Sequence, residues 1–267
     1  MNVETNTKIE ICDLTMAYGS FVVMRNINAR VKRGEVFIIM GGSGCGKSTL
    51  LRHMIGLKQP ARGDILYDGV PFWKSADDAR KEKLRSFGVL FQSGALWSSM
   101  TLADNIGLVL GEYTGFSPPE IREIARLKLS LVGLKGFEDY YPAEISGGMR
   151  KRAGLARALA LDPDVLFFDE PSAGLDPISA RNLDELILQL RDSLGATFVV
   201  VTHELASIFT IADNSVFLDA NTRSMRAFGN PRELLKHSTD PAVQQFLSRG
   251  EAFIPSTPAE PSTSQTS

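Results

Sequence analysis

The sequence predicts an α/β fold with a parallel β-sheet and an inserted helical segment. Short apolar runs of the buried-strand type, such as 36–40 and 165–168, alternate with segments whose apolar residues repeat at helical spacing. Strands that alternate with helices in this way pair in parallel. Between residues 94 and 162 the strand pattern gives way to helices, so this segment is expected to be an insertion into the α/β domain.

The first seventy residues carry the patterns of four strands and one helix. The expected strands are 9–14, 22–31, 36–40 and 63–69, with a turn at 18–20. The helix is expected over 47–55, because Gly56 stands where a helix commonly ends in a glycine of left-handed conformation.

Two longer helices are marked by the spacing of their apolar residues. The segment 117–120, Ser-Pro-Pro-Glu, has the form of a capping box and predicts a helix start. The apolar residues that follow it, ending near Gly133, are Ile121, Ile124, Leu127 and Leu131. Leucines at helical spacing over 183–194 predict a second helix, which ends at Gly195 and leads into a strand over 197–201.

The composition is that of an ordinary globular protein. With 43% hydrophobic and 22% charged residues among 267, disorder of the whole chain is excluded, and one large or two small domains are expected. The net charge of −2 does not favour binding to bulk nucleic acid. No apolar run reaches the roughly 18 residues of a membrane helix, and no signal peptide is expected. Cys12 and Cys45 make no disulfide framework and fit a reducing compartment.

One segment matches the phosphate-binding pattern G-x-x-x-x-G-K-[ST] in full. Its residues are Gly41, Gly42, Ser43, Gly44, Cys45, Gly46, Lys47 and Ser48, and Thr49 follows. The segment lies between an apolar strand and a helix, so glycine N–H groups and the helix N-terminus are expected to surround phosphate oxygens. Lys47 is expected to neutralise the β- and γ-phosphates of ATP, and Ser48 to ligate Mg²⁺.

A second pair of candidate residues, Asp169 and Glu170, follows the apolar run 165–168. In open α/β sheets, ligands bind beyond the carboxyl ends of the strands, where this run would deliver both carboxylates. Asp169 is expected to hold Mg²⁺, directly or through water, and Glu170 to act as general base on the attacking water. An ordinary Asp-Glu turn is the alternative, but the phosphate-binding segment favours the catalytic interpretation.

A Ser-Gly-Gly turn about twenty residues before Asp169 narrows the interpretation further. The residues of this segment are Ile145, Ser146, Gly147, Gly148 and Met149. The turn opens a basic, alanine-rich helix, and the helix N-terminus provides a second anion-binding cradle. With these motifs, residues 8–230 resemble the ATP-binding cassette (ABC) ATPase family. The signature of that family is Leu-Ser-Gly-Gly-Gln, so Met149 departs from it by removing the amide hydrogen bond.

The resemblance implies roles for further positions. Tyr18 matches the aromatic residue that stacks on adenine, and His203 matches the histidine that contacts the γ-phosphate. Gln92 matches the glutamine that links the Mg²⁺ and water site to the helical insertion. Residues 173–176 match the loop that crosses the interface of a dimer. The resemblance therefore implies two ATP sites in a head-to-tail dimer, each closed in trans by Ser146, Gly147 and Gly148.

The expected fold follows from the same resemblance. It is a P-loop NTPase core with a parallel sheet, an antiparallel β subdomain and an inserted helical subdomain. The expected boundaries are 8–93 and 163–230 for the core, 94–162 for the helical signature subdomain, 231–250 for a C-terminal helical extension and 251–267 for a disordered tail.

Within the family, the chain is similar to the ATPases of Mla-type, MCE-linked phospholipid transport systems of Gram-negative bacteria. The similar segments are 91–97, 145–149, 173–177 and 240–247. The similarity implies a peripheral ATPase on the cytoplasmic face of the inner membrane, which energises phospholipid movement between the inner and outer membranes. The implied partners are a second copy, an integral membrane permease dimer, an MCE-domain lipid-binding protein and a small STAS-domain protein. No nucleic-acid role is implied.

Three other functions are alternatives to this one. Import of amino acids or another small solute is the alternative within transporters. A cassette ATPase that moves no solute is disfavoured, because the interval between Gln92 and Ser146 has room only for a compact helical subdomain. A regulator that binds nucleotide without hydrolysis is disfavoured by the presence of Glu170 and His203.

Four local features each allow two interpretations. Cys45, at a helix N-terminus, is expected to have a lowered thiol pKa and to react with alkylating reagents, unless it is an inert spacer. The basic run 150–152 is expected to be a solvated helix face rather than a nucleic-acid patch. The apolar side of 240–247 packs on its own domain or on the neighbouring ATPase. Trp97 faces a permease or packs inside the helical subdomain.

Overall fold

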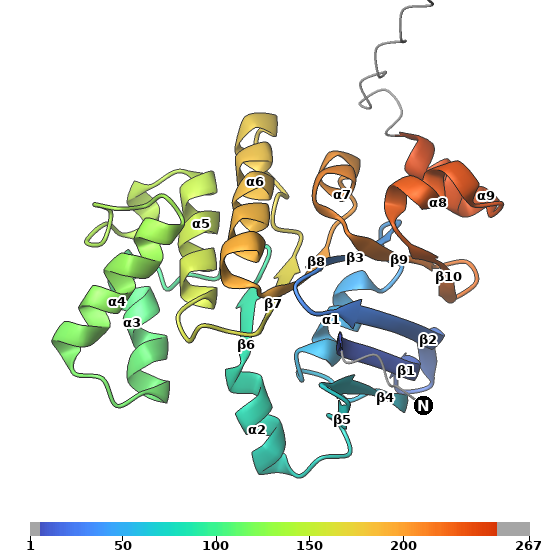
Figure 1. Ribbon diagram of the computed structural model, residues 1–267, viewed down its shortest axis with the longest axis horizontal. Coiled ribbons are helices and arrows are strands. Elements are labelled where there is room, and N and C mark those ends of the chain that lie inside the picture. Colours follow the sequence, from blue (N-terminus) through green and yellow to red (C-terminus); the bar gives the residue numbers. More distant parts are fainter. Residues whose placement is uncertain (1–5, 250–267) are drawn as a thin grey trace, which may run out of the picture.

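The computed structural model describes residues 6–249, which fold into two β-sheets with helices between and around them (Figure 1). The α/β fold with a parallel sheet, an antiparallel sheet and added helices is confirmed. Within the described range, no helix is both long and apolar enough to cross a membrane. The tail expected over 251–267 lies outside the described residues.

The larger sheet has the strand order β10-β9-β3-β8-β7-β6. Its strands are β3 (Val36–Gly41), β6 (Phe87–Leu90), β7 (Val165–Asp169), β8 (Thr197–Val201), β9 (Asn214–Asp219) and β10 (Ser224–Gly229). Neighbours pair in parallel except for β9 and β10, which are antiparallel at one edge. Every residue of β3 and β8 is buried, as expected for parallel strands covered on both faces.

The smaller sheet is antiparallel and has the order β2-β1-β4-β5. Its strands are β1 (Thr7–Tyr18), β2 (Phe21–Lys32), β4 (Arg62–Tyr67) and β5 (Val70–Pro71). Helix α1 (Lys47–Met54) packs between this sheet and the larger one, because Leu50, Leu51 and Met54 share one apolar cluster with Phe37 of β3 and the buried residues of β1. The helix that begins after the phosphate-binding segment is therefore held from two sides.

The opposite face of the larger sheet is covered by helices. These are α3 (Leu102–Tyr113), α4 (Pro118–Leu131), α5 (Gly147–Ala158), α6 (Pro177–Leu194) and α7 (Leu205–Ile211). Alternate strand residues such as Ile38 and Val200 point to this face and pack with them. In Figure 1, α3, α4 and α5 stand together at one end of the molecule, beside α6.

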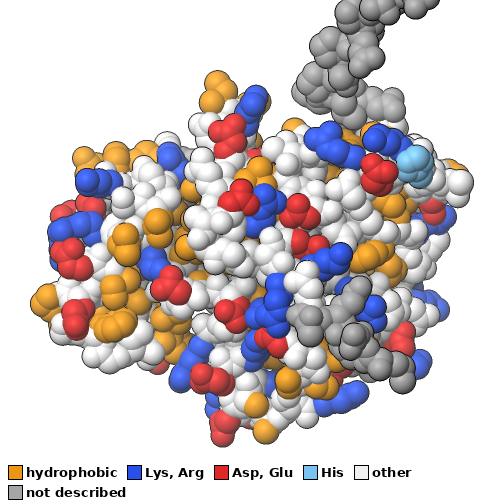
Figure 2. Space-filling view, viewed as in Figure 1, with side chains coloured by type: hydrophobic (Ala, Val, Ile, Leu, Met, Phe, Trp, Pro, Cys, Tyr) orange, Lys and Arg blue, Asp and Glu red, His pale blue; other side chains and the backbone are white. Residues whose placement is uncertain are grey.

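Two helices differ from expectation. The capping box of α4 is present, but the helix buries Ala125, Lys128 and Leu129, while Leu127 and Leu131 are 57% and 40% exposed. Apolar side chains accordingly appear on the surface over α3 and α4 (Figure 2). Helix α2 (Asp77–Arg85) was not expected, because none of its residues is buried and it therefore has no hydrophobic periodicity to detect.

The C-terminal extension consists of α8 (Pro231–His237) and α9 (Pro241–Leu247), and it packs on its own subunit. Val243, Phe246 and Leu247 of α9 are buried, and the ring of Phe246 contacts that of Phe217 on β9 at 5.2 Å. These three side chains are therefore not free to dock on a neighbouring ATPase.

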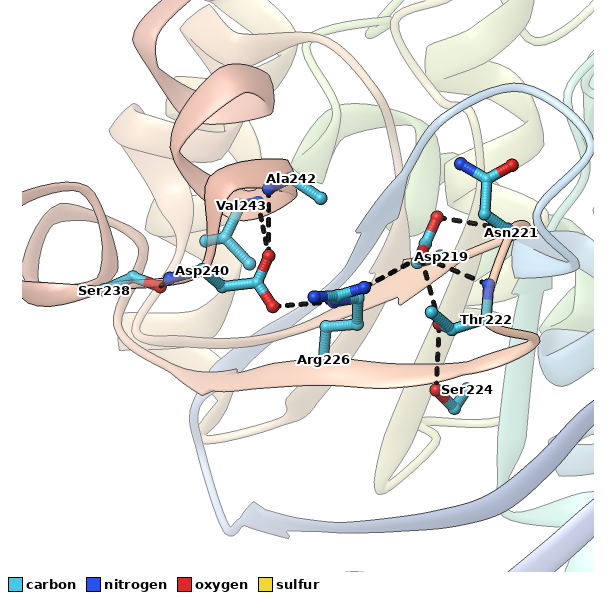
Figure 3. Close-up of polar contacts among 9 residues, drawn as sticks. All are labelled: Asp219, Asn221, Thr222, Ser224, Arg226, Ser238, Asp240, Ala242 and Val243. Carbon is cyan, nitrogen blue, oxygen red and sulfur yellow. Dashed lines mark hydrogen bonds and ion pairs between the residues drawn. The ribbon is translucent and has the colours of Figure 1, made fainter.

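A charged contact fixes the start of α9 (Figure 3). Asp240 caps the helix by accepting hydrogen bonds from the N–H groups of Ala242 and Val243, and its other oxygen accepts from Arg226 Nε at 2.6 Å. Arg226 also pairs with Asp219 at the end of β9, at 3.5 Å. The hairpin of β9 and β10 is thereby linked to the extension.

Asp184 is a carboxyl group buried between α6 and α7. It is 5% exposed, and burial raises its pKa to about 6, with a smaller contribution from Glu204 and Glu185 and an opposing hydrogen bond from Ser207. Because the folded state binds this proton more tightly than the unfolded state, stability falls as the pH rises from about 4 to about 6 and the penalty persists above that range.

We predict that Asp184→Asn stabilises the protein at pH 8 by about 1–3 kcal/mol, because the amide removes the cost of a buried charge. The gain should be much smaller near pH 4, where the carboxyl group is protonated in the folded state and about half protonated in the unfolded state. Urea unfolding at pH 4, 6 and 8 measures this effect. The control is Asp78→Asn on α2, whose side chain is 97% exposed. A gain that does not change with pH would contradict the assignment.

Candidate functional site

The phosphate-binding segment forms a loop between β3 and α1, and its glycines are required by close contacts. A Cβ atom on Gly41 would lie 2.3 Å from the carbonyl oxygen of Leu218, so no larger residue fits there. Gly44 and Gly46 have left-handed φ angles of +73° and +96°. A Cβ on Gly42 or Gly44 would meet nothing within 4 Å, so this side of the loop is open to a ligand.

The loop presents donors for an anion. Lys47 is 7% exposed, and its Nζ donates to the carbonyl oxygens of Gly41 and Gly42, each at 3.0 Å. Gly46 is the N-cap of α1 and no side chain caps the helix, so the first N–H groups of α1 are available to phosphate oxygens. A buried ammonium beside free helix N–H groups fits a polyphosphate.

Ser48 and Asp169, the residues predicted to hold Mg²⁺, lie together in the structure. Ser48 Oγ donates to Asp169 Oδ1 at 2.9 Å, although 121 positions separate the two residues. A hydroxyl and a carboxylate oxygen beside a phosphate loop are the hard donors that Mg²⁺ prefers, and Mg²⁺ takes its remaining ligands from water and phosphate. The residues present therefore fit Mg²⁺ bound together with a nucleotide.

Glu170 and His203 lie against each other beyond the ends of β7 and β8. His203 Nδ1 lies 2.8 Å from Glu170 Oε1, and it donates this hydrogen bond when the carboxylate is ionised. The second oxygen, Glu170 Oε2, is buried and has no hydrogen-bond partner. The backbone of Glu170 has a left-handed φ of +50°, and its N–H donates to the carbonyl of Val201 at 2.9 Å. A carboxylate with one unpaired buried oxygen is suited to accept a proton from water.

Gln92 lies beside Glu170 in the strand register. Leu90 of β6 pairs with Phe168 of β7, and Gln92 and Glu170 each follow two residues later. Parallel strand ends meet at one edge of the sheet, so both residues flank the same edge. The side chain of Gln92 is exposed.

Tyr18 lies at the end of β1, next to α1. A hydrogen bond with the side chain of Thr49 and another with Arg52 lower the pKa of its phenol. The ring is 45% exposed, and Lys58 Nζ lies 3.4 Å from the ring centroid. The structure thus brings Tyr18 and Thr49 to the helix that follows the phosphate loop, with the aromatic ring accessible for stacking.

The Ser-Gly-Gly turn lies at a separate helix N-terminus, that of α5. Ser146 caps this helix by accepting from the N–H of Met149 at 3.2 Å. A Cβ atom on Gly148 would lie 3.6 Å from Ser179 near the start of α6. That helix is itself capped by Asp176, and the next residue but one, Ile178, is 74% exposed. Both helix starts are open to a partner.

The basic run 150–152 is not simply a solvated face. Lys151 is 6% exposed and donates to the main-chain carbonyl of Gln92. Arg157, one further turn along α5, donates to the carbonyls of Gly94 and Ala95. The expectation is wrong for Lys151, because the helix turns its side chain inward. The signal in the sequence was that Lys151 lies three and four residues before Gly154 and Leu155, which are also buried on α5.

Cys45 is not an activated thiol. It is 1% exposed, and burial raises its thiol pKa, with Lys47 opposing the effect only in part. A Cβ atom on Gly41 would lie 2.7 Å from Cys45 Sγ, so the thiol fills the space behind the loop. The expectation of a lowered pKa is wrong, because desolvation outweighs the field of the helix N-terminus.

We predict that iodoacetamide alkylates Cys45 at least about 10-fold more slowly in the native protein at pH 7.5 than in urea, since a buried thiol with a raised pKa forms little thiolate. Timed labelling followed by peptide mass spectrometry measures the rate, with Cys12 as an internal reference. Fast labelling of native Cys45 that MgATP slows would contradict this.

The chain matches known proteins over most of its length. Residues 24–173 match the family described as ABC transporter. Over 90% of the chain it is 45% identical to "Probable ribonucleotide transport ATP-binding protein mkl" of Mycobacterium tuberculosis, although it spans only 66% of that relative. Over 92% of both chains it is 41% identical to "Intermembrane phospholipid transport system ATP-binding protein MlaF" of Haemophilus influenzae.

A solved structure shows the same fold. The dimeric post-hydrolysis state of the ATP-binding cassette MJ0796, bound to ADP and Pi, has a TM-score of 0.75 at 28% identity and covers 83% of this chain and 98% of its own. With the loop, the paired carboxylates and the second helix N-terminus in place, the chain belongs to the ABC transporter ATP-binding family.

Proposed function

We propose that the chain hydrolyses ATP and that this hydrolysis drives a membrane transporter for phospholipid. The contact between Glu170 Oε1 and His203 Nδ1 at 2.8 Å carries the first part. It lies one residue from the Ser48–Asp169 contact, so a base and a cation site occupy consecutive positions at one strand end. This is the arrangement that attack of water on a terminal phosphate requires.

Each residue then has a defined task. The loop 41–48 holds the β- and γ-phosphates, and Lys47 exchanges its carbonyl partners for phosphate oxygens. Mg²⁺, held by Ser48 and Asp169, supplies neutralisation of the phosphate charge when bound. Glu170 accepts the proton of the attacking water at Oε2. His203 holds the other oxygen of that carboxylate and faces the γ-phosphate.

The site is completed by a second copy of the chain. Ser146, Gly147 and Gly148 start α5 with free N–H groups, which suit the phosphates of an ATP bound to the partner. The dimeric cassette bound to ADP and Pi supports a head-to-tail arrangement. Closure when ATP is bound and opening after hydrolysis would then be a two-state element biased by the γ-phosphate.

Phospholipid is the substrate class that the relatives favour. The match to the phospholipid transport ATPase covers 92% of the length of each protein, so it extends over nearly all of both. On this basis the chain acts at the cytoplasmic face of the inner membrane, with an MCE-domain protein and a STAS-domain protein among its partners. The mycobacterial relative is named as a probable ribonucleotide transport protein, which favours small-solute import as the second candidate.

A groove beside α5 is the proposed permease contact. It has a volume of about 430 Å³ and is lined by α2, β6, α3 and α5, including Arg85, Tyr113 and Arg157. Arg157 also holds the carbonyl of Ala95, two residues before Trp97. Trp97 is 58% exposed, which removes the interpretation that it packs in the helical core. A large exposed aromatic side chain is typical of an interface.

We predict that Glu170→Gln retains ATP binding and lowers the rate of hydrolysis at least about 100-fold, because the amide cannot accept the proton. ATP binding and phosphate release are measured on the purified transporter complex. Accumulation of an ATP-bound dimer is the further expected result. Turnover at the normal rate would exclude Glu170 as the base.

We predict that Trp97→Ala leaves folding and ATP binding unchanged but lowers lipid transfer per ATP by at least about 5-fold, as expected for an interface aromatic. The measurements are melting temperature and lipid transfer between vesicles by the reconstituted complex. Phe21→Ala, an aromatic that is 56% exposed on the antiparallel sheet, is the control. If the wild-type complex moves a small solute and no lipid, the second candidate replaces the first.

A further inference from the structure

Side chains of helix α5 hold the loop that follows β6 by hydrogen bonds to the main-chain carbonyls of that loop. Lys151 donates to the carbonyl of Gln92, and Arg157 donates to those of Gly94 at 3.1 Å and Ala95 at 2.7 Å. Between these two cations lies Gly154, where a Cβ atom would be 3.0 Å from the oxygen of Gly94. Positions 151, 154 and 157 share one face of the helix, so α5 and the loop move as one body.

Lys151 also reaches the base. Its Nζ donates to the main-chain carbonyl of Glu170 at 3.4 Å as well as to that of Gln92. One ammonium therefore spans the two segments that follow β6 and β7. Among the described residues, no other side chain of α5 hydrogen-bonds to both segments.

Glu170 is a residue that needs to be held. Its φ of +50° is uncommon outside glycine and costs of order 1 kcal/mol or more unless its surroundings fix it. The N–H of Glu170 is fixed by Val201 at 2.9 Å. The carbonyl side of the same residue is fixed by Lys151. Together these contacts fix the backbone that carries the carboxylate.

The charge of Lys151 indicates that it does more than fill space. Burial lowers the pKa of its ammonium, and the Glu170 carboxylate opposes this. A buried cation whose partners are carbonyl dipoles opposes folding, whereas a neutral side chain of similar length would cost less. A role in the chemistry at Glu170 would compensate for this cost of burial.

We propose that Lys151 is a positioning residue for ATP hydrolysis, which ties the main chain of Glu170 and Gln92 to α5. Movement of the helical segment is thereby transmitted to the carboxylate. Because α5 begins at Ser146, contact of that turn with a partner's ATP would set the base in the same step. The inference rests on the proposed role of Glu170.

The test compares Lys151→Met with Lys128→Met in the full chain, purified with its permease. Lys128 is an equally suitable buried lysine, with 5% side-chain exposure, but it pairs with Asp162 away from the site. Lys151→Arg restores charge and donors. Lys151→Gln, which is neutral and one bond shorter, is used as the folded variant if the methionine variant is unstable.

We expect Lys151→Met to lower kcat by about 10–100-fold while KM for ATP stays within about 3-fold, because positioning acts on the reaction and not on binding. The melting temperature should fall by no more than it does in Lys128→Met, whose kcat should stay normal. Lys151→Arg should recover most of the activity, and Lys151→Gln should recover less than Lys151→Arg.

Normal kcat in Lys151→Met or Lys151→Gln would overturn the proposal, and so would a rise in KM at unchanged kcat. A loss of activity that Lys151→Arg does not recover would also overturn it. Glu170→Gln is measured in parallel. If Glu170→Gln is inactive and Lys151→Met is normal, only the positioning role fails. If Glu170→Gln turns over normally, the proposed base itself fails.

Discussion

Parallel pairing of β3, β8, β7 and β6 is the constraint on which the site depends. Because these strands run in one direction, their carboxyl ends meet at one edge, where the loops after them carry the phosphate-binding segment, both carboxylates, Gln92 and His203. Ser48 and Asp169 thus come within 2.9 Å across 121 positions of sequence. Apolar clusters on both faces of the sheet keep the strands in register and so keep these groups in place.

The site also stores electrostatic cost that a ligand can relieve. Lys47 and Lys151 are 7% and 6% exposed, and both have only main-chain carbonyls as hydrogen-bond acceptors. Carbonyl dipoles compensate a buried ammonium only in part, so Lys47, which belongs to the phosphate loop, is suited to exchange its carbonyl partners for a polyanion. Lys128, which is equally buried, is instead paired with the carboxylate of Asp162. Burial of a lysine is therefore informative only together with its partners.

The helical segment contributes a second layer of control. Helix α5 begins at a turn that is open to a partner and continues along the loop after β6, so one rigid element contacts both. Rigid helices transmit small rotations because packed interfaces do not deform continuously. At the other edge of the sheet, α9 packs on Phe217 of β9, and Arg226 links Asp219 to Asp240. The extension therefore stabilises the strand next to β3.

The sequence by itself predicted the α/β class, the buried strands and the phosphate loop, and it indicated Glu170 as the candidate base, because each depends on local pattern or on a motif of fixed spacing. Helix α2 could not be predicted from the sequence, since a helix with no buried residue has no apolar periodicity. The exposed Leu127 and the buried Lys128 show the same limit, because the face that a helix buries depends on its neighbours. Only the tertiary structure decided that Cys45 is shielded and that Lys151 joins Gln92 to Glu170, because desolvation and contact between distant segments exist only once the chain has folded.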